Sequence, residues 1–354
     1  MYRQRFRILE TLATWPWPRA INPHYCEVKA ESSAWLEGFK AFNPEAQASF
    51  NSCDFNLLAS LAYPLARKDY LRTGCDLMNL FFVIDEYTDA EDELHAAMIA
   101  NINDGRSQES IQTTTSRGIN YRRNGSSVRL FSLICSYPTS FTYFAKLVTS
   151  GREDAGEGTV TRFIRTMGEF FDAIVIQSDD LTKFVTPGLE SYIHVRRDTS
   201  GCKPCFQLTE YAGQYDLPEV VNHPLLQKME QSTNDLATWS NDIFSYDKKQ
   251  IRDDTHNMIS VVMHYYNYGL QEAVDFVGQM RSQAMKNFNA DREKLPSFGP
   301  EIDDMVQNYG QGLQDWIIGS LHWSFHIERY FGKHGPEVKI HRTVCLSAAK
   351  APLN

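Results

Sequence analysis

The chain has 354 residues, a formal charge of −9 and a pI of about 5.6, with 42% hydrophobic and 22% charged residues. This composition is ordinary for a globular protein and supplies enough apolar residues for a sizeable core. It argues against a nucleic-acid-binding protein, which usually carries a basic excess or a basic stripe. No stretch approaches the roughly 20 apolar residues of a membrane span, and the first residues lack the continuous apolar run of a signal peptide. We therefore expect a cytoplasmic protein without a stable membrane anchor.

The N-terminal segment, residues 1–25, is predicted to be an extended arm, because prolines at positions 16, 18 and 23 exclude a regular helix. Apolar periodicity predicts helices over most of the remaining chain. They span residues 52–66, 69–84, 159–178, 187–195, 206–213, 224–249, 255–266, 269–289, 299–309 and 312–330. Since no β-alternation of useful length and no internal repeat occurs, the predicted fold class is all-α.

Residues 101–158 do not fit this pattern. Their first half is rich in Ser, Thr, Arg and Gly and lacks helical periodicity, and their second half is apolar but not amphipathic. A loop of this length is uncommon inside a compact helical domain. Two interpretations remain open: an atypical insertion, or a segment that is not native coding sequence, such as a retained intron. Uninterrupted transcript reads through the segment would contradict the second.

The seven cysteines are scattered and odd in number, so we expect reduced core thiols. Cys202 and Cys205 form a lone CxxC without a second pair at zinc spacing, which argues against a zinc or redox site.

The first stretch that suggests chemistry is FFVIDEYTDAEDE, residues 81–93. Asp85 and Asp89 are four residues apart, so their carboxylates project from one helix face, with Glu86 beside them. Hard oxygen ligands of this kind suit Mg²⁺, which often bridges a carboxylate to a phosphate. The alternative is a solvated acidic helix end. The apolar run before Asp85, with Phe81 one turn away on the same face, favours a metal at the mouth of an apolar pocket.

The second stretch is NDIFSYDKKQ, residues 241–250. Asn241 and Ser245 lie on one helix face, where two short oxygen-bearing side chains can share a metal ion. The next position on this face is occupied by Lys249, which cannot ligate a cation. A solvated polar helix face is the alternative.

Two further stretches supply donors for an anion. In HWSFHIERYFG, residues 322–332, Arg329 offers a forked guanidinium suited to phosphate and Tyr330 a hydroxyl. Trp316, Trp323 and Tyr330 recur every seven residues, and for Trp316 a core position is the better interpretation. In HVRRDTSGCKP, residues 194–204, two arginines precede a turn signal.

The four stretches together resemble class I terpene synthases, in the order and spacing of DEYTD, NDIFS, RRDTSG and the Arg–Tyr pair. The resemblance is strongest to sesquiterpene synthases of basidiomycete fungi. It rests also on WPWPRAINPHY, FKAFNPEAQ, CDFNLLASLAYP, GCDLMNLFFVIDEYTD, RFIRTM and SFHIERYFG, and it covers roughly residues 5–100 and 159–342. Residues 101–158 do not resemble the family.

The resemblance implies a single domain over residues 1–354, a helical bundle around an apolar cavity, and three Mg²⁺ ions that bind the diphosphate of farnesyl diphosphate. Its implied reaction is ionisation of that substrate and cyclisation of the carbocation to a sesquiterpene. The implied metal ligands are Asp85, Asp89, Asn241 and Ser245, with Glu86 less certain. The implied diphosphate donors are Arg329, Tyr330 and either Arg196 or Arg197. Phe81 or Phe82 would stabilise the carbocation by cation–π contact.

The sequence departs from the family at Lys249, where the second metal-binding motif ends with Glu. Asp242 and Asp247 point elsewhere on the helix and do not replace this ligand well. We therefore expect weakened Mg²⁺ affinity and reduced turnover, which Lys249→Glu should raise. Two alternatives stay open: Lys248 and Lys249 hold the diphosphate directly, or the chain is a degenerate helical protein that binds diphosphate without turnover. A chain-elongating prenyltransferase is disfavoured, since it would need a second aspartate-rich motif in place of Asn241 and Ser245.

Overall fold

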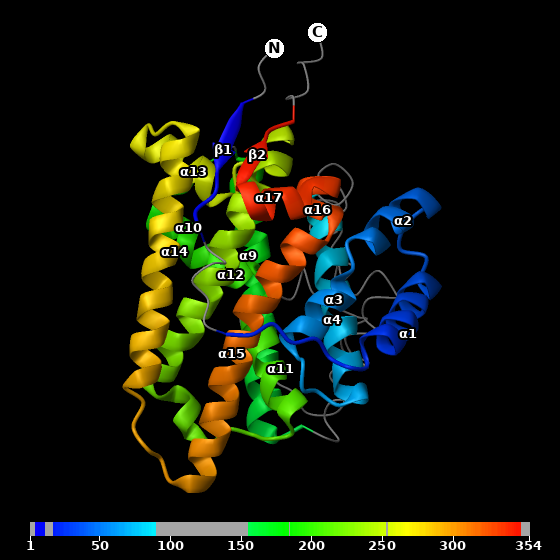
Figure 1. The fold of residues 1–354 in the computed structure, drawn as a ribbon, viewed down its shortest axis with the longest axis vertical. Coiled ribbons are helices and arrows are strands. Elements are labelled where there is room, and N and C mark those ends of the chain that lie inside the picture. Colours follow the sequence, from blue (N-terminus) through cyan, green and yellow to red (C-terminus); the bar gives the residue numbers. More distant parts are fainter. Residues whose placement is uncertain (1–3, 11–16, 90–154, 184, 253, 348–354) are drawn as a thin grey trace, which may run out of the picture.

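The computed structural model describes residues 4–10, 17–89, 155–183, 185–252 and 254–347, without the side chains of residues 87–89 and 182. Helices dominate this part of the chain (Figure 1), which confirms the all-α class. The helices are α1 (Tyr25–Gly38), α2 (Pro44–Ser52), α3 (Phe55–Ala62), α4 (Lys68–Asp89), α9 (Glu157–Thr182), α10 (Leu189–Thr199), α11 (Cys202–Gly213), α12 (Pro224–Ile251), α13 (Met258–Tyr266), α14 (Leu270–Glu293), α15 (Pro300–His326), α16 (Glu328–Phe331) and α17 (Gly335–His341). Two short 3₁₀ turns, η2 (Glu219–Asn222) and η3 (Gly332–His334), complete the helical elements.

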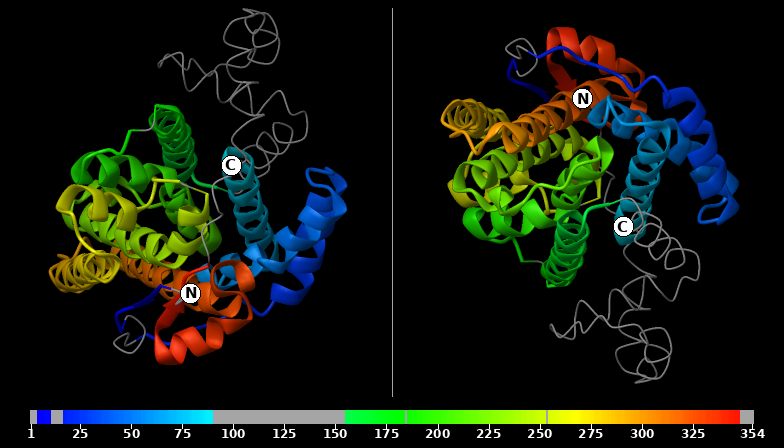
Figure 2. Two further views of the ribbon diagram at one scale, coloured as in Figure 1. Left: turned by 90° about the horizontal axis from the view of Figure 1, so that it is seen from above. Right: turned by 90° about the horizontal axis from the view of Figure 1, so that it is seen from below.

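Helix α12 lies at the centre of the bundle, between α14 on one side and α15, α11 and α10 on the others. Figure 2 views the helices nearly end-on, with α1 and α2 outside α4 on the side opposite α14. The middle of α12 is buried almost without interruption from Ser232 to Ser240, so this helix has no solvent-facing stripe there. An all-round buried helix of this kind belongs in the core of a large bundle. The polar residues that it carries therefore face other protein groups or an internal cavity.

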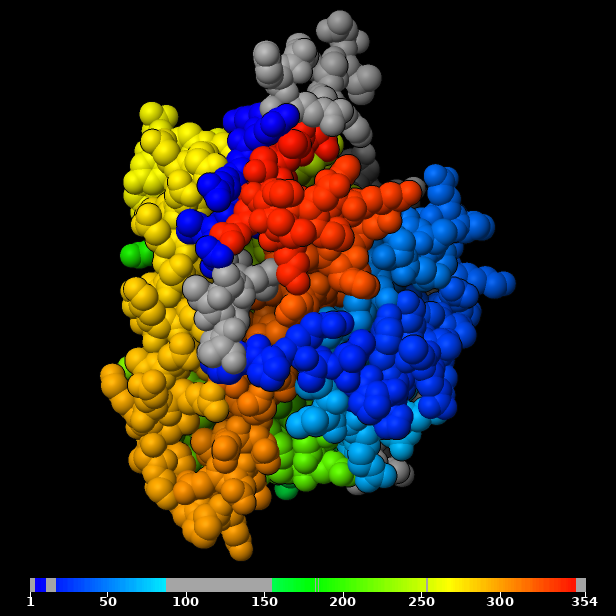
Figure 3. All heavy atoms as spheres, viewed as in Figure 1, coloured from blue at the N-terminus to red at the C-terminus, as the bar shows by residue number. Residues whose placement is uncertain are grey.

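The two chain ends meet in a small antiparallel sheet. Strand β1 (Arg5–Arg7) pairs with β2 (Thr343–Cys345), with Phe6 opposite Val344, and both of these central residues are buried. These strands are not predictable from the sequence, because three residues are too few for a visible alternation. Between β1 and α1 the chain crosses α15 (Figures 1 and 3), and the Asn22 amide donates to the carbonyls of Tyr63 and Ala66 beyond α3.

Several predicted helix boundaries are wrong. The expected helix 52–66 is shorter, because Asp54 adopts a left-handed conformation and caps α3 through its carboxylate. The expected helices 299–309 and 312–330 form one helix, α15, that ends at His326. Gly312 lies inside α15 and does not interrupt it. Its lack of a side chain permits close packing against α11, because a Cβ at Gly312 would lie 2.1 Å from Cγ2 of Thr209.

Helices α1, α2 and α17 were not predicted. Only Val28, Ser32 and Leu36 of α1 are buried, so its apolar pattern is weak. For α2 a signal was present: Asn43 accepts a hydrogen bond from the Ala46 amide, and Pro44 follows at the first helical position.

The atypical segment 101–158 lies outside the described residues except for its last four, which lead into α9. Six of the cysteines are described and all are free thiols; Cys26 and Cys345 are exposed, so the expectation of core thiols is wrong for these two. Among the described residues, no helix is long and apolar enough to cross a membrane.

Candidate active site

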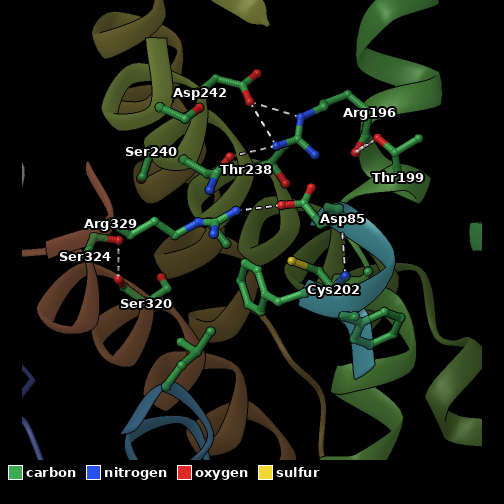
Figure 4. A pocket seen from close by; sticks show the side chains of 18 of the residues that line it. Asp85, Arg196, Thr199, Cys202, Thr238, Ser240, Asp242, Ser320, Ser324 and Arg329 are labelled. Carbon is green, nitrogen blue, oxygen red and sulfur yellow. Dashed lines mark hydrogen bonds and ion pairs between the residues drawn. The ribbon is translucent and has the colours of Figure 1, made fainter. Parts of the chain in front are cut away.

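A cavity of about 190 Å³ opens among α4, α9, α10, α11, α12, α15 and α16 (Figure 4). Its lining combines aromatic side chains with charged and amide side chains. The four stretches singled out in the sequence all contribute to this lining. Segments separated by up to 244 residues are thus brought to one pocket.

Aromatic rings from α4 and α15 form the apolar part. Phe81 and Phe82 both line the cavity; Phe81 packs edge-on against Phe170, and Phe82 stacks on Phe55 with ring centroids 3.7 Å apart. Trp316 is 4% exposed, as expected for a core residue, but it also lines the cavity. The interpretation of Trp316 as a core residue alone is therefore too narrow.

Arg329 reaches the first acidic stretch because the long helix α15 stops before it. Ile327 has an extended backbone, with φ −91° and ψ 161°, and the short helix α16 starts in a new direction. Two guanidinium nitrogens of Arg329 donate to the first acidic stretch, at 2.6 Å to Asp85 and 2.7 Å to Glu86. Burial alone would lower the pKa of Arg329, but the Asp85 charge raises it above its ordinary value. The guanidinium also lies 5.1 Å from the Phe82 ring centroid, within cation–π range.

Asn241, in the second stretch, forms hydrogen bonds with Arg196 of α10 and Tyr330 of α16. Its side-chain oxygen accepts from Arg196 Nη2 at 3.0 Å, and its amide nitrogen donates to the Tyr330 hydroxyl at 2.8 Å. Ser245 lies one turn further along α12 and lines the same pocket. Burial raises the pKa of Tyr330 to about 12, so its hydroxyl stays protonated and able to donate.

The structure separates the two neighbouring arginines. Arg196 lines the pocket and pairs with Asp242 at 2.9 Å, whereas Arg197 forms a fork with Asp235 at 2.7 and 2.8 Å and is not among the described lining residues. Asp242 is 1% exposed and also accepts from the Tyr192 hydroxyl, which fixes it in place behind Arg196. Asp242 therefore orients a cation at the site.

The turn after these arginines gives α11 its starting position. Gly201 has φ +67°, a left-handed conformation that favours glycine, and a Cβ there would touch the Phe81 ring at 3.4 Å. The Ser200 hydroxyl accepts from the Cys202 amide at the beginning of α11. The turn signal in this stretch is thus confirmed, and it caps the next helix.

Lys249 lines the pocket and forms an ion pair with Asp254, with Nζ 2.5 Å from Oδ2. The second oxygen of Asp254 accepts from the His256 amide at 2.8 Å. Sequence reasoning considered Asp242 and Asp247 as neighbours of Lys249 and missed Asp254, which lies beyond the end of α12. Lys248, Arg252 and His256 also line the pocket. The available signal was the charged run IRDDTH directly after the second stretch.

The donor set suits a hard divalent cation. Asp85 and Glu86 supply carboxylate oxygens from one wall, and Asn241 and Ser245 supply an amide and a hydroxyl oxygen from the other. Within the described side chains, no three His, Cys, Asp or Glu groups come together at one point. Asp89 is the last residue of α4, but its side chain lies outside the described part of the molecule.

Comparison with known proteins agrees with this geometry. Residues 76–287 match the family model described as terpene synthase family 2, C-terminal metal binding. The chain is 40% identical over 344 residues to an alpha-muurolene synthase of Coprinopsis cinerea, covering 95% of this chain and 76% of the relative. It is 42% identical over 340 residues to a Delta(6)-protoilludene synthase of Stereum hirsutum, covering 95% of this chain and 86% of the relative.

Solved structures show the same fold at low sequence identity. An α-eudesmol synthase superposes with a TM-score of 0.72 at 21% identity, covering 88% of this chain and 97% of that one. A germacradien-4-ol synthase from Streptomyces citricolor superposes with a TM-score of 0.70 at 21% identity, covering 90% of this chain and 99% of that one. The family-model match, the full-length relatives and the shared fold together lead to one conclusion: the chain belongs to the terpene synthase family.

Proposed function

We propose that this protein is a Mg²⁺-dependent sesquiterpene synthase that converts farnesyl diphosphate to a sesquiterpene and inorganic diphosphate. The observation that carries the proposal is a single cavity with an aromatic interior and a mouth that joins oxygen donors for a cation to guanidinium donors for an anion. Two relatives from Postia placenta, each 40% identical over 94% of this chain, are named sesquiterpene synthases, and they support the substrate class. The comparisons do not favour the alternative of a degenerate protein.

Bound Mg²⁺ would neutralise the charge that develops on the leaving diphosphate. Asp85, Asn241 and Ser245 would hold it, with Asp89 as a further ligand and Glu86 beside them; three ions are expected from the resemblance. The reacting allylic C–O bond breaks, its electron pair leaves with the diphosphate oxygen, and a carbocation remains in the cavity.

The chain's own cations act on the leaving group. Arg329 and Tyr330 donate to the diphosphate from α16, and Arg196 donates from α10, where Asp242 orients it. Such donors accelerate the reaction when they are aimed at charge that develops in the transition state. Arg197, held by Asp235 outside the described lining, is a structural residue in this proposal.

In the structure each of the two guanidinium donors is held by a residue that would bind metal. Arg329 pairs with Asp85, and Arg196 donates to Asn241. A diphosphate at the mouth offers both guanidinium groups a new partner and so leaves the oxygen donors available. The exchange of an ion pair at Arg329 and of a hydrogen bond at Arg196 would keep both guanidinium groups partnered before and after substrate binding.

The interior then controls the fate of the carbocation. Phe81, Phe82 and Trp316 present ring faces or edges to the cavity, and aromatic faces stabilise cations by about 0.5–2 kcal/mol each. An apolar lining also keeps out water, which would quench the cation. Loss of a proton ends the reaction and gives the hydrocarbon.

The test is incubation of the purified protein with farnesyl diphosphate and Mg²⁺, followed by headspace analysis. We expect a hydrocarbon of sesquiterpene mass and release of inorganic diphosphate. A protein that binds inorganic diphosphate but releases no hydrocarbon under these conditions would establish the degenerate alternative and overturn the proposal.

A further inference from the structure

The charged end of the pocket carries more cations than carboxylates. Among the described lining residues the cations are Arg196, Lys248, Lys249, Arg252 and Arg329, and the carboxylates are Asp85, Glu86 and Asp242. The imidazole of His256 stays neutral there, because burial and then repulsion from Arg196 and Lys249 hold its pKa well below its ordinary value. This end of the pocket is thus positively charged before any metal ion binds.

Four of these cations come from the ends of two helices. Arg196 comes from the last turn of α10, and Lys248, Lys249 and Arg252 come from the end of α12 and the residue after it. Lys248 makes no ion pair within the described part of the chain, although it lines the pocket. Partial burial and then repulsion from Arg329 lower its pKa. An anion placed here would relieve that repulsion.

Lys249 is positioned to change partner. Its side chain is 17% exposed, and its carboxylate partner Asp254 is 8% exposed. Asp254 keeps a second hydrogen bond, from the His256 amide, so it does not depend on Lys249 alone. Lys249 can therefore turn to an anion in the pocket without leaving a buried carboxylate with no donor.

We propose that Lys248, Lys249, Arg252 and Arg196 form a site that binds inorganic diphosphate in the absence of divalent metal ions, with Lys249 exchanging Asp254 for the anion. The inference deepens the proposed function, since the site would hold the product of that reaction. It concerns this chain in particular, because a carboxylate in place of Lys249 would balance the charges of the described lining residues, whereas the lysine leaves them net positive. Binding by these cations alone does not assist ionisation of the substrate. It would instead hold the product diphosphate after the metal ions have left, which inhibits turnover.

The experiment is isothermal titration of the full chain with inorganic diphosphate in EDTA. We expect saturable binding of diphosphate and weaker binding of inorganic phosphate, which reaches fewer of the cations. Lys249→Met should weaken diphosphate binding about 10- to 100-fold, the range for one hydrogen bond to a charged group. Lys228→Met is the matched control, since Lys228 is exposed near the opposite end of the same helix, and it should bind as the unaltered chain does.

A second variant guards against misfolding as an explanation. Asp254→Asn removes the competing carboxylate and should tighten diphosphate binding in EDTA, opposite to the effect of Lys249→Met. No binding in EDTA, or equal binding by the chain and Lys249→Met, would overturn the inference, as would weaker binding by Asp254→Asn. Hydrocarbon production with no metal-free binding would sink this inference alone, whereas metal-free binding without hydrocarbon would sink only the proposed function.

Discussion

Arg329 and Asp85 are 244 residues apart in the sequence, yet Nη2 of Arg329 lies 2.6 Å from Oδ2 of Asp85. The pair joins the proposed diphosphate donor to the proposed metal ligand at one end of an aromatic cavity. The two opposite charges form an ion pair. The forked geometry of the Arg329 guanidinium can be tested separately from its charge.

Arg329→Lys keeps the charge but removes the planar fork. We expect kcat with farnesyl diphosphate to fall about 10²- to 10³-fold, the cost of removing one donor aimed at developing charge. Arg165→Lys is the control, because Arg165 lies exposed on α9 and pairs with Glu169 in the next turn. A kcat for Arg329→Lys within a factor of three of the control would remove Arg329 from the leaving-group site.

Substitution of Arg196 should affect catalysis, whereas substitution of the adjacent Arg197 should affect stability. Arg196→Met should lower kcat at least about 100-fold, because this guanidinium lies in the pocket. Arg197→Met should leave kcat nearly unchanged and lower the free energy of unfolding by about 1–3 kcal/mol, since it strands the buried carboxylate of Asp235. Kinetics and urea denaturation of both variants check this assignment. If Arg197→Met is the one that loses turnover, the roles are reversed.

Lys249→Glu should strengthen Mg²⁺ binding and weaken metal-free diphosphate binding. It adds a carboxylate beside Ser245, so the Mg²⁺ concentration that gives half-maximal turnover should fall about tenfold and activity at limiting Mg²⁺ should rise. The Lys249–Asp254 ion pair makes this gain smaller than an uncompensated lysine would imply. The same variant should lose diphosphate binding in EDTA. Equal turnover of both forms at limiting Mg²⁺ would show that Lys249 does not weaken the metal site.

A pH dependence of stability should arise away from the active site, between α12 and α15. Burial raises the pKa of Glu230 to about 7 from an ordinary value of 4.5, while the Tyr309 hydroxyl that donates to it works in the opposite direction. A raised folded-state pKa means that the charged form is disfavoured in the fold. Stability from this group is therefore full below about pH 4.5 and is lost as the pH rises to about 7.

Glu230→Gln removes this titration. At pH 8 the variant should be more stable than the unaltered chain, by at most about 3 kcal/mol, and near pH 4.5 the two should be alike. Denaturation with urea at both pH values measures the difference. A stability difference that does not change with pH would exclude Glu230 as its source.

Gly312 tests the packing between α15 and α11. Gly312→Ala places a Cβ 2.1 Å from Cγ2 of Thr209, so we expect a loss of about 1–3 kcal/mol in the free energy of unfolding. Gly38→Ala is the matched control, because nothing lies within 4 Å of a Cβ there. Thermal unfolding of both variants decides the point. Equal melting temperatures would mean that α15 can shift away from Thr209 without cost.

The local pattern of the sequence determined the helical class and the residues on which the site is built. Asn241 and Ser245 are recognisable because four-residue spacing places both side chains on one helix face, whereas the roles of Asp85 and of the Arg329–Tyr330 pair are implied by the resemblance. The interruption of α15 at Ile327 was not recognisable, because apolar periodicity continues through it while the backbone changes direction. The predicted break at residues 310 and 311 was likewise wrong, since a glycine inside a packed helix looks the same in sequence as one that ends a helix.

The tertiary structure decided which charges meet. Adjacent arginines look equivalent in the sequence, and only the packing of α10 against α12 gives Asp242 to Arg196 and Asp235 to Arg197. The partner of Lys249 is five residues away, beyond the end of α12, where helical spacing no longer predicts direction. Electrostatic partnership depends on distance in three dimensions and on burial, and neither is fixed by the order of residues along the chain.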